Sequence, residues 1–227
     1  MCTVVIRHLP GEPVRALALR DELTGRDFDD PGAWWPDQPT AVGGRDRQAG
    51  GTWCASDVVT GTTAFVLNRP QRREAEPGAP SRGVLPLLAL QYGEAWPQHL
   101  DCRGMASFAL LLATPKHLAL WVFDGATLTR EGLPPGTHMV TSGGAEDGKA
   151  ERYLGALQGG DVGTWRALLQ QHPPEPDPAS LVVRLERDGR TYATVFGQLI
   201  TSAPGHLELE WSRQPWHADG WTSRRWP

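Results

Sequence analysis

The apolar residues of this chain come in short, β-branched runs that glycine and proline repeatedly interrupt. The chain has 227 residues, among them 26 glycines and 20 prolines. Short β-branched runs bounded by turn-forming residues are typical of strands rather than long helices. The pattern therefore predicts an α+β fold built mainly on antiparallel sheet. The length and the lack of internal repeats predict one domain spanning 1–227.

Four pairs of runs are predicted to form hairpins. They pair 2–8 with 14–20, 52–59 with 62–68, 105–113 with 118–123, and 181–187 with 190–200. Helices are predicted over 84–92, 146–157 and 161–171, the last with Asp161 as its N-cap. The segments 71–82 and 172–178 are predicted to be irregular.

Charge and cysteine content exclude several classes of protein. A net charge of −4 argues against nucleic-acid or anionic-membrane partners, because both need a basic face. The three cysteines include no C-x-x-C pair, which disfavours a disulfide framework or a zinc knuckle. No signal peptide is readable, because Arg7 and His8 break the N-terminal apolar run. An integral membrane segment is not expected either, because Pro115, Lys116 and His117 interrupt the most apolar stretch. A soluble cytoplasmic protein is expected.

The first predicted hairpin brings Cys2 opposite Arg20. Side chains directly opposite in an antiparallel pair have β-carbons about 5 Å apart. A guanidinium beside a thiol stabilises the thiolate, and Asp21 or Glu22 at the exit of the strand would hold an α-ammonium group. The alternative interpretation is a buried cysteine at the start of an ordinary strand, with Arg20 and Asp21 as a surface ion pair.

The position of Cys2 next to the initiator methionine adds weight to the chemical interpretation. Cysteine is small enough for Met1 to be removed, which would place an α-amine beside the thiol. A nucleophile and a general base on one residue are the basis of N-terminal nucleophile catalysis.

Several short motifs carry a resemblance to a known family. They are Met1-Cys2-Thr3, Arg20-Asp21-Glu22, Gly50-Gly51-Thr52-Trp53, Leu67-Asn68-Arg69 and Ser81-Arg82-Gly83. In this order and spacing they resemble the NRDE family, whose animal members are called transport and Golgi organisation protein two. Thr141-Ser142-Gly143 stands where the family has Leu-Ser-Asn. The expected arginine in the segment 177–181 is absent.

The resemblance implies both a fold and a set of site residues. The implied fold is the four-layer αββα sandwich of antiparallel sheets found in N-terminal nucleophile hydrolases. The N-terminal Cys, Arg and Asp of choloylglycine hydrolases and penicillin V acylases correspond to Cys2, Arg20 and Asp21. Asn68 resembles an oxyanion-hole asparagine, and symmetric pairing about Thr60-Gly61 would place it opposite Trp53.

Tryptophan is abundant, with ten residues in the chain. Trp34, Trp35 and Trp53, together with Glu22, are the predicted ligand-binding residues, which would line an aromatic pocket. The alternative is that the bulky rings anchor loops and a C-terminal tail. The last four tryptophans recur every five residues, a period that fits neither helix nor strand.

No metal site is predicted. The seven histidines form no H-E-x-x-H motif, and no serine lies in G-x-S-x-G. His99 and Cys102 are three residues apart and would suit a metal or haem, although a solvated loop is the simpler interpretation.

Two function hypotheses follow. One is an amidase or acyltransferase that acts on a small-molecule amide through Cys2 and requires no cofactor. The other, implied by the family resemblance, is a non-catalytic carrier that binds haem or a lipid or acyl-CoA ligand.

Overall fold

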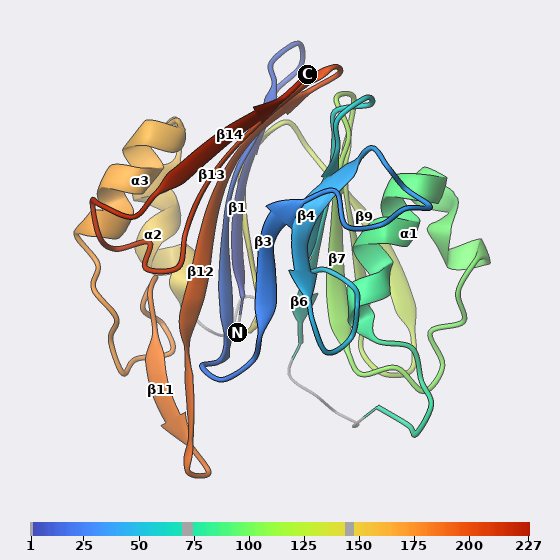
Figure 1. The fold of residues 1–227 in the computed structure, drawn as a ribbon, viewed down its shortest axis with the longest axis horizontal. Coiled ribbons are helices and arrows are strands. Elements are labelled where there is room, and N and C mark those ends of the chain that lie inside the picture. Colours follow the sequence, from blue (N-terminus) through green and yellow to red (C-terminus); the bar gives the residue numbers. More distant parts are fainter. Residues whose placement is uncertain (1, 70–74, 144–147) are drawn as a thin grey trace.

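The computed structural model describes residues 2–69, 75–143 and 148–227, which form two antiparallel sheets packed face to face (Figure 1). The first sheet has the order β10-β1-β2-β12-β13-β14, with β11 paired to one end of β12. Its strands are β1 (Thr3–His8), β2 (Val14–Leu23), β10 (Gly136–Thr141), β11 (Arg184–Arg187), β12 (Arg190–Ala203), β13 (His206–Ser212) and β14 (Thr222–Trp226).

The second sheet is a meander in which each strand pairs with the next along the chain. Its strands are β3 (Phe28–Gly32), β4 (Ala41–Asp46), β5 (Cys54–Asp57), β6 (Thr62–Asn68), β7 (Phe108–Ala113), β8 (Leu118–Phe123) and β9 (Leu128–Leu133).

Helices cover the outer faces of both sheets (Figure 1). Helix α1 (Leu85–Tyr92), with short 3-10 turns before and after it, packs on the second sheet; α2 (Lys149–Leu157) and α3 (Val162–Gln170) pack on the first. The start of the helix predicted over 146–157 lies outside the described residues. Asp161 caps α3, as predicted, because its carboxylate accepts a hydrogen bond from the Thr164 N–H at 2.8 Å.

Three apolar clusters fill the spaces between these layers. Phe65, Leu111 and Phe196 belong to the cluster between the sheets. Trp96, in the 3-10 turn after α1, is buried in the cluster on the second sheet, and Trp165 is buried between α3 and the first sheet. The described residues therefore stack in the order helix, sheet, sheet, helix, and the predicted α+β sandwich of antiparallel sheets is confirmed.

The predicted register of the first hairpin is confirmed, and that of the second is wrong. In the first hairpin Thr3 lies opposite Leu19, which is the predicted register. In the second, Cys54 lies opposite Phe65, so the prediction that Asn68 faces Trp53 is wrong by two residues. The cause is Asp57, whose carboxylate accepts the N–H groups of Val59 and Thr60 and so makes a four-residue turn instead of a two-residue one.

The third and fourth hairpins form as β7–β8 and β11–β12. Of the segments predicted to be irregular, 71–74 lie outside the described residues; 172–178 has no helix, and a single bridge joins Glu175 to Val183. Within the described part of the chain, no helix is long and apolar enough to cross a membrane.

Candidate active site around Cys2

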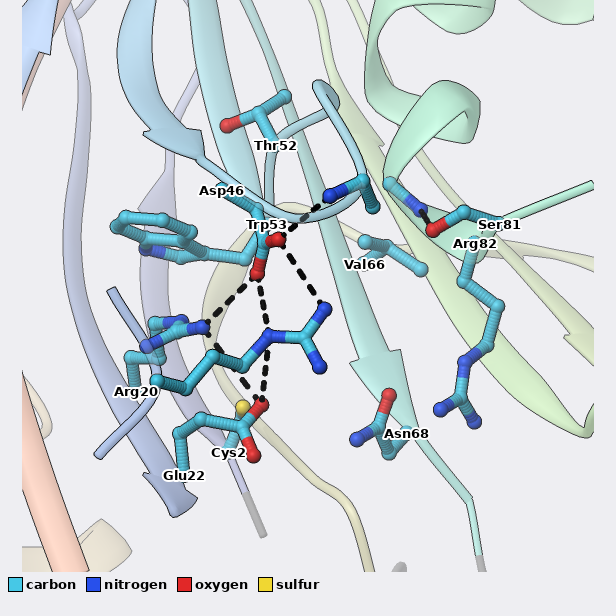
Figure 2. Close-up of a pocket in the computed structure, with 13 residues that line it drawn as sticks. Cys2, Arg20, Glu22, Asp46, Thr52, Trp53, Val66, Asn68, Ser81 and Arg82 are labelled. Atoms are coloured by element: carbon cyan, nitrogen blue, oxygen red, sulfur yellow. Dashed lines mark hydrogen bonds and ion pairs between the residues drawn. The ribbon is translucent and has the colours of Figure 1, made fainter. Parts of the chain in front are cut away.

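A cavity of about 110 Å³ opens at the end of the inter-sheet space where β1 begins and β6 ends. Figure 2 shows the residues around it. The lining residues come from several separate segments: Cys2, Arg20, Glu22, Arg26, Asp46, Ala49, Thr52, Trp53, Val66, Asn68, Ser81, Arg82 and Gly83. Each of the five sequence motifs supplies at least one of them.

The alternation of side chains along β1 and β2 explains which residues face the cavity. Even-numbered residues of both strands pack in the inter-sheet core, whereas odd-numbered ones face α2 and α3. Cys2, Arg20 and Glu22 therefore point between the sheets, while Thr3 and Asp21 point toward the helices. The sequence-predicted pairing of Cys2 with Arg20 is the continuation of the observed register.

A β-bulge in β12 lies directly across from this part of β2. Thr194 pairs with Asp21 and Phe196 pairs with Arg20, so Val195 is the extra residue. Bulges are common next to active sites, where they redirect a side chain. Here the bulge places the Thr194 hydroxyl 2.6 Å from Asp21 Oδ1, to which it donates a hydrogen bond.

The backbone of Cys2 is held on both sides by Ser142. The Cys2 nitrogen donates to Ser142 Oγ at 2.6 Å, and the Ser142 N–H donates to the Cys2 carbonyl at 2.9 Å. Ser142 therefore fixes the position of the Cys2 nitrogen.

Burial raises the pKa of the Cys2 thiol, and the negative charge of Asp21 acts in the same direction. The Asp21 backbone N–H and the Arg20 guanidinium oppose this rise in pKa without cancelling it. Arg20 thus favours the thiolate, as expected, but burial outweighs this effect and the pKa of the thiol is raised overall.

Arg20 is almost completely buried, with a side chain that is 4% exposed. Its guanidinium lies 4.6 Å from the Trp53 ring and 5.1 Å from the Phe28 ring, and its Nη2 lies 3.2 Å from Asp46 Oδ2 and 3.6 Å from Glu22 Oε2. Aromatic faces and carboxylates together compensate for the loss of water around the buried cation.

Asp46 joins several polar groups of the cavity wall to one another. This residue was not identified in the sequence analysis. Arg26 donates to both of its carboxylate oxygens at 2.6 and 3.1 Å, and the N–H groups of Gln48 and Ala49 donate to Oδ1. Burial acts to raise the pKa of Asp46, but the bonds from Arg26 and Ala49 outweigh it and hold the pKa below its ordinary value. No local motif marks this aspartate.

On the opposite face of the first sheet, Asp21 meets the buried amine of Lys149 from α2. Lys149 Nζ lies 3.5 Å from Asp21 Oδ2 and donates to Thr3 Oγ1 at 3.2 Å. Both charged side chains are only 1% exposed. Asp21 is thus part of a buried ion pair on the helix side of the first sheet. Lys149 is a second residue that was not identified in the sequence analysis.

The remaining predicted residues divide into two groups. Asn68 and Trp53 line the cavity, as do Cys2, Arg20 and Glu22. Trp34 and Trp35 do not: the Trp34 indole donates to the Asp30 carbonyl and the Trp35 indole to the Gly50 carbonyl, both at 3.0 Å. In these contacts each ring braces the backbone of a neighbouring loop.

Cys54 and Cys102 are buried, and burial raises the pKa of both thiols, that of Cys102 to about 11. All three cysteines are free. Among the described residues, no group of three or more His, Cys, Asp or Glu side chains is arranged to hold a metal ion.

Comparison with known proteins agrees with the motifs. No curated protein matched the chain. The family model described as Transport and Golgi organisation 2 matches residues 1–159, which include every residue that lines the cavity. The resemblance noted in the sequence is thereby confirmed, and the chain belongs to the Transport and Golgi organisation 2 family.

Proposed function

We propose that this protein is an N-terminal-cysteine amidohydrolase or acyltransferase that acts on a small amide. The observation that carries the proposal is the placement of Cys2 in a polar cavity whose walls are built from all five motif segments. Enclosed polar groups that converge on a nucleophilic side chain are the usual arrangement at a reactive site.

The chemistry requires the α-amine that removal of Met1 exposes. The amine takes the thiol proton, and the sulfur adds to the amide carbonyl carbon to form a tetrahedral oxyanion. The resulting ammonium then protonates the nitrogen of the leaving amine, and a thioester remains on Cys2. Water, deprotonated by the same amine, cleaves the thioester; an acceptor amine in place of water gives acyl transfer.

A thiol with a raised pKa suits this scheme. At neutral pH the sulfur keeps its proton until the adjacent amine removes it, so the base is part of the nucleophilic residue. Ser142 supports the step because it holds the Cys2 nitrogen at 2.6 Å. The Asn68 amide lines the same cavity and would donate to the oxyanion, a contribution of about 3 kcal/mol to the transition state.

The test combines intact mass with acylation. The native protein is expected to lack Met1 and, on incubation with p-nitrophenyl acetate, to gain one acetyl group at Cys2. Cys54→Ala, which changes a buried thiol outside the cavity, should acylate as the wild type does, and Cys2→Ala should not. Retention of Met1 in the native protein would exclude the amine-assisted mechanism, and a Cys2 that reacts no faster than a free thiol would exclude the catalytic role.

The carrier function implied by the family stays a prediction. A cavity of about 110 Å³ is smaller than the roughly 300–1,000 Å³ of pockets that hold drug-sized ligands, so haem or acyl-CoA would have to bind elsewhere or open the site. Saturable quenching of tryptophan fluorescence by micromolar haem or acyl-CoA would favour it over the enzyme.

A further inference from the structure

The charged side chains around the Cys2 cavity are unequally paired. Arg20 and Arg26 both form ion pairs with Asp46, at 3.2 and 2.6 Å, and both lie within 4.0 Å of Glu22. Within 2–69, 75–143 and 148–227, no carboxylate forms an ion pair with Arg82. Among the described residues, the cavity wall therefore carries three guanidinium groups and two carboxylates, and the guanidinium without an ion pair is that of Arg82.

The position of Arg82 is fixed by its surroundings. Its Nη1 donates to the Ser107 carbonyl at 2.9 Å, which anchors one edge of the guanidinium. The next residue, Gly83, accepts a bond from the Thr52 N–H at 2.8 Å and packs so closely on Gly51 that a β-carbon on Gly51 would lie 2.4 Å from it. Figure 2 shows the Arg82 side chain running along the cavity toward Asn68.

Arg82 is also electrically coupled to the nucleophile. Burial lowers the pKa of its guanidinium, and the charges of Cys2 and Glu22 act to raise it. A partly desolvated guanidinium without a carboxylate is costly, and its planar donors match a carboxylate well. A ligand anion would therefore supply the counter-charge that the described residues do not give to Arg82.

We propose that Arg82 binds a carboxylate of the ligand, so that the substrate of this site is a small amide with an anionic group close to its carbonyl. The assignment of Cys2 as the reacting atom rests on the proposed function. Anion binding at Arg82 requires no turnover, so it can be tested separately.

The test compares two alkylating reagents of nearly equal size at Cys2. Iodoacetate carries a carboxylate where iodoacetamide carries a neutral amide, and the same sulfur attacks both. We take the ratio of the iodoacetate rate to the iodoacetamide rate at Cys2 and divide it by the same ratio at a free thiol. This normalised ratio is independent of the pKa of Cys2. We expect this ratio to favour iodoacetate and to fall about tenfold in Arg82→Gln, as for one partly screened charge near the reagent.

Two further variants make the result specific. Arg82→Lys keeps the charge and should keep most of the preference for iodoacetate. Arg103→Gln removes an exposed arginine that is paired with Asp101 and does not line the cavity, so its ratio should equal that of the wild type. An unchanged ratio in Arg82→Gln would overturn the proposal and leave Arg82 as an anchor for the Ser107 carbonyl.

Equilibrium binding gives a second measurement that does not depend on thiol reactivity. N-acetylglycine and its neutral analogue N-acetylglycinamide are titrated while the indole N–H resonance of Trp53 is followed. Tighter binding of the anion, lost in Arg82→Gln, supports the proposal, and equal binding of the two compounds overturns it. If Cys2 fails to acylate but the anion still binds through Arg82, the proposed reaction is wrong and the anion site stands.

Discussion

The carboxylate of Asp46 accepts hydrogen bonds from two arginines and from two backbone N–H groups of the loop that follows β4. Through these bonds it joins Arg20 on the first sheet to Arg26 and to Ala49 at the cavity wall. Because its side chain is only 10% exposed, water cannot replace these partners if the carboxylate is lost.

Replacing Asp46 with Asn should lower the free energy of unfolding by about 2 kcal/mol at neutral pH, because the buried Arg20 and the half-buried Arg26 lose one of their two carboxylate partners. The pKa of Asp46 is lowered in the folded protein, so its contribution to stability is present above the unfolded pKa and is lost as pH falls through the folded value. Urea denaturation from neutral to acidic pH should show the difference between the two proteins shrinking.

Asp101→Asn is the matched control, because its partner Arg103 is exposed and should leave stability unchanged. Equal stability of Asp46→Asn and the wild type at neutral pH would show that the arginines find other partners.

Some residues of the site could be predicted from the sequence and others could not. Cys2 and Arg20 were predictable because a short hairpin fixes its own register. Asp46 and Lys149 were not, because the charged side chains that they pair with are 20 or more residues away in the chain, and these contacts exist only after the sheets and α2 pack. Trp34 and Trp35 were assigned to the ligand from their residue type and their place in a loop near the expected site, whereas their indoles donate to backbone carbonyls, which is the alternative role of anchoring loops.

Among the elements, the approach of Gly51 to Gly83 shapes one wall of the cavity. The two backbones are so close that Thr52 can donate directly to the Gly83 carbonyl. The glycines that precede β5 are thus needed for a close contact between chain segments and not only for a turn.

Gly51→Ala should destabilise the protein by about 2 kcal/mol, because its β-carbon would overlap the Gly83 backbone and push Arg82 out of place. Gly132→Ala is the control, since a β-carbon there meets no atom within 4 Å. Thermal unfolding of both variants measures the effect. A Gly51→Ala protein as stable as Gly132→Ala would mean that the contact is readily relaxed.

The predicted elements were those with an apolar pattern of their own. Two of the strands that were missed, β9 and β14, are edge strands whose residues are mostly exposed and polar. Their pairing comes from a neighbouring strand and not from their own hydrophobicity, so a pattern search over the sequence cannot find them. The turn between β5 and β6 could not be predicted either. Its register is set by the side chain of Asp57 and not by the turn dipeptide.

In the molecule as a whole, β12 is the strand that completes the first sheet. It lies between β2 and β13, pairs with β2 from Tyr192 to Ser202, and brings Phe196 against the Trp53 ring at 5.6 Å. The family match ends at residue 159, so this central strand comes from the part of the chain beyond the match.

A chain that ends at residue 159 should therefore not fold cooperatively, although it contains every cavity residue. It would expose the edge of β2 and leave the Thr194 and Phe196 contacts unmade. Circular dichroism and urea denaturation of the fragment, alone and mixed with 160–227, check this expectation. A cooperative transition for the fragment alone would contradict it.

The start of β1 has a practical consequence for how the protein is produced. β1 is paired on both sides, and its first residues lie at the cavity, whereas β14 lies at the edge of the first sheet and carries the C-terminus away from it (Figure 1). An affinity tag fused ahead of Cys2 would therefore emerge at the cavity and acylate or block the very nitrogen that Ser142 holds. A tag after β14 leaves that nitrogen free for study.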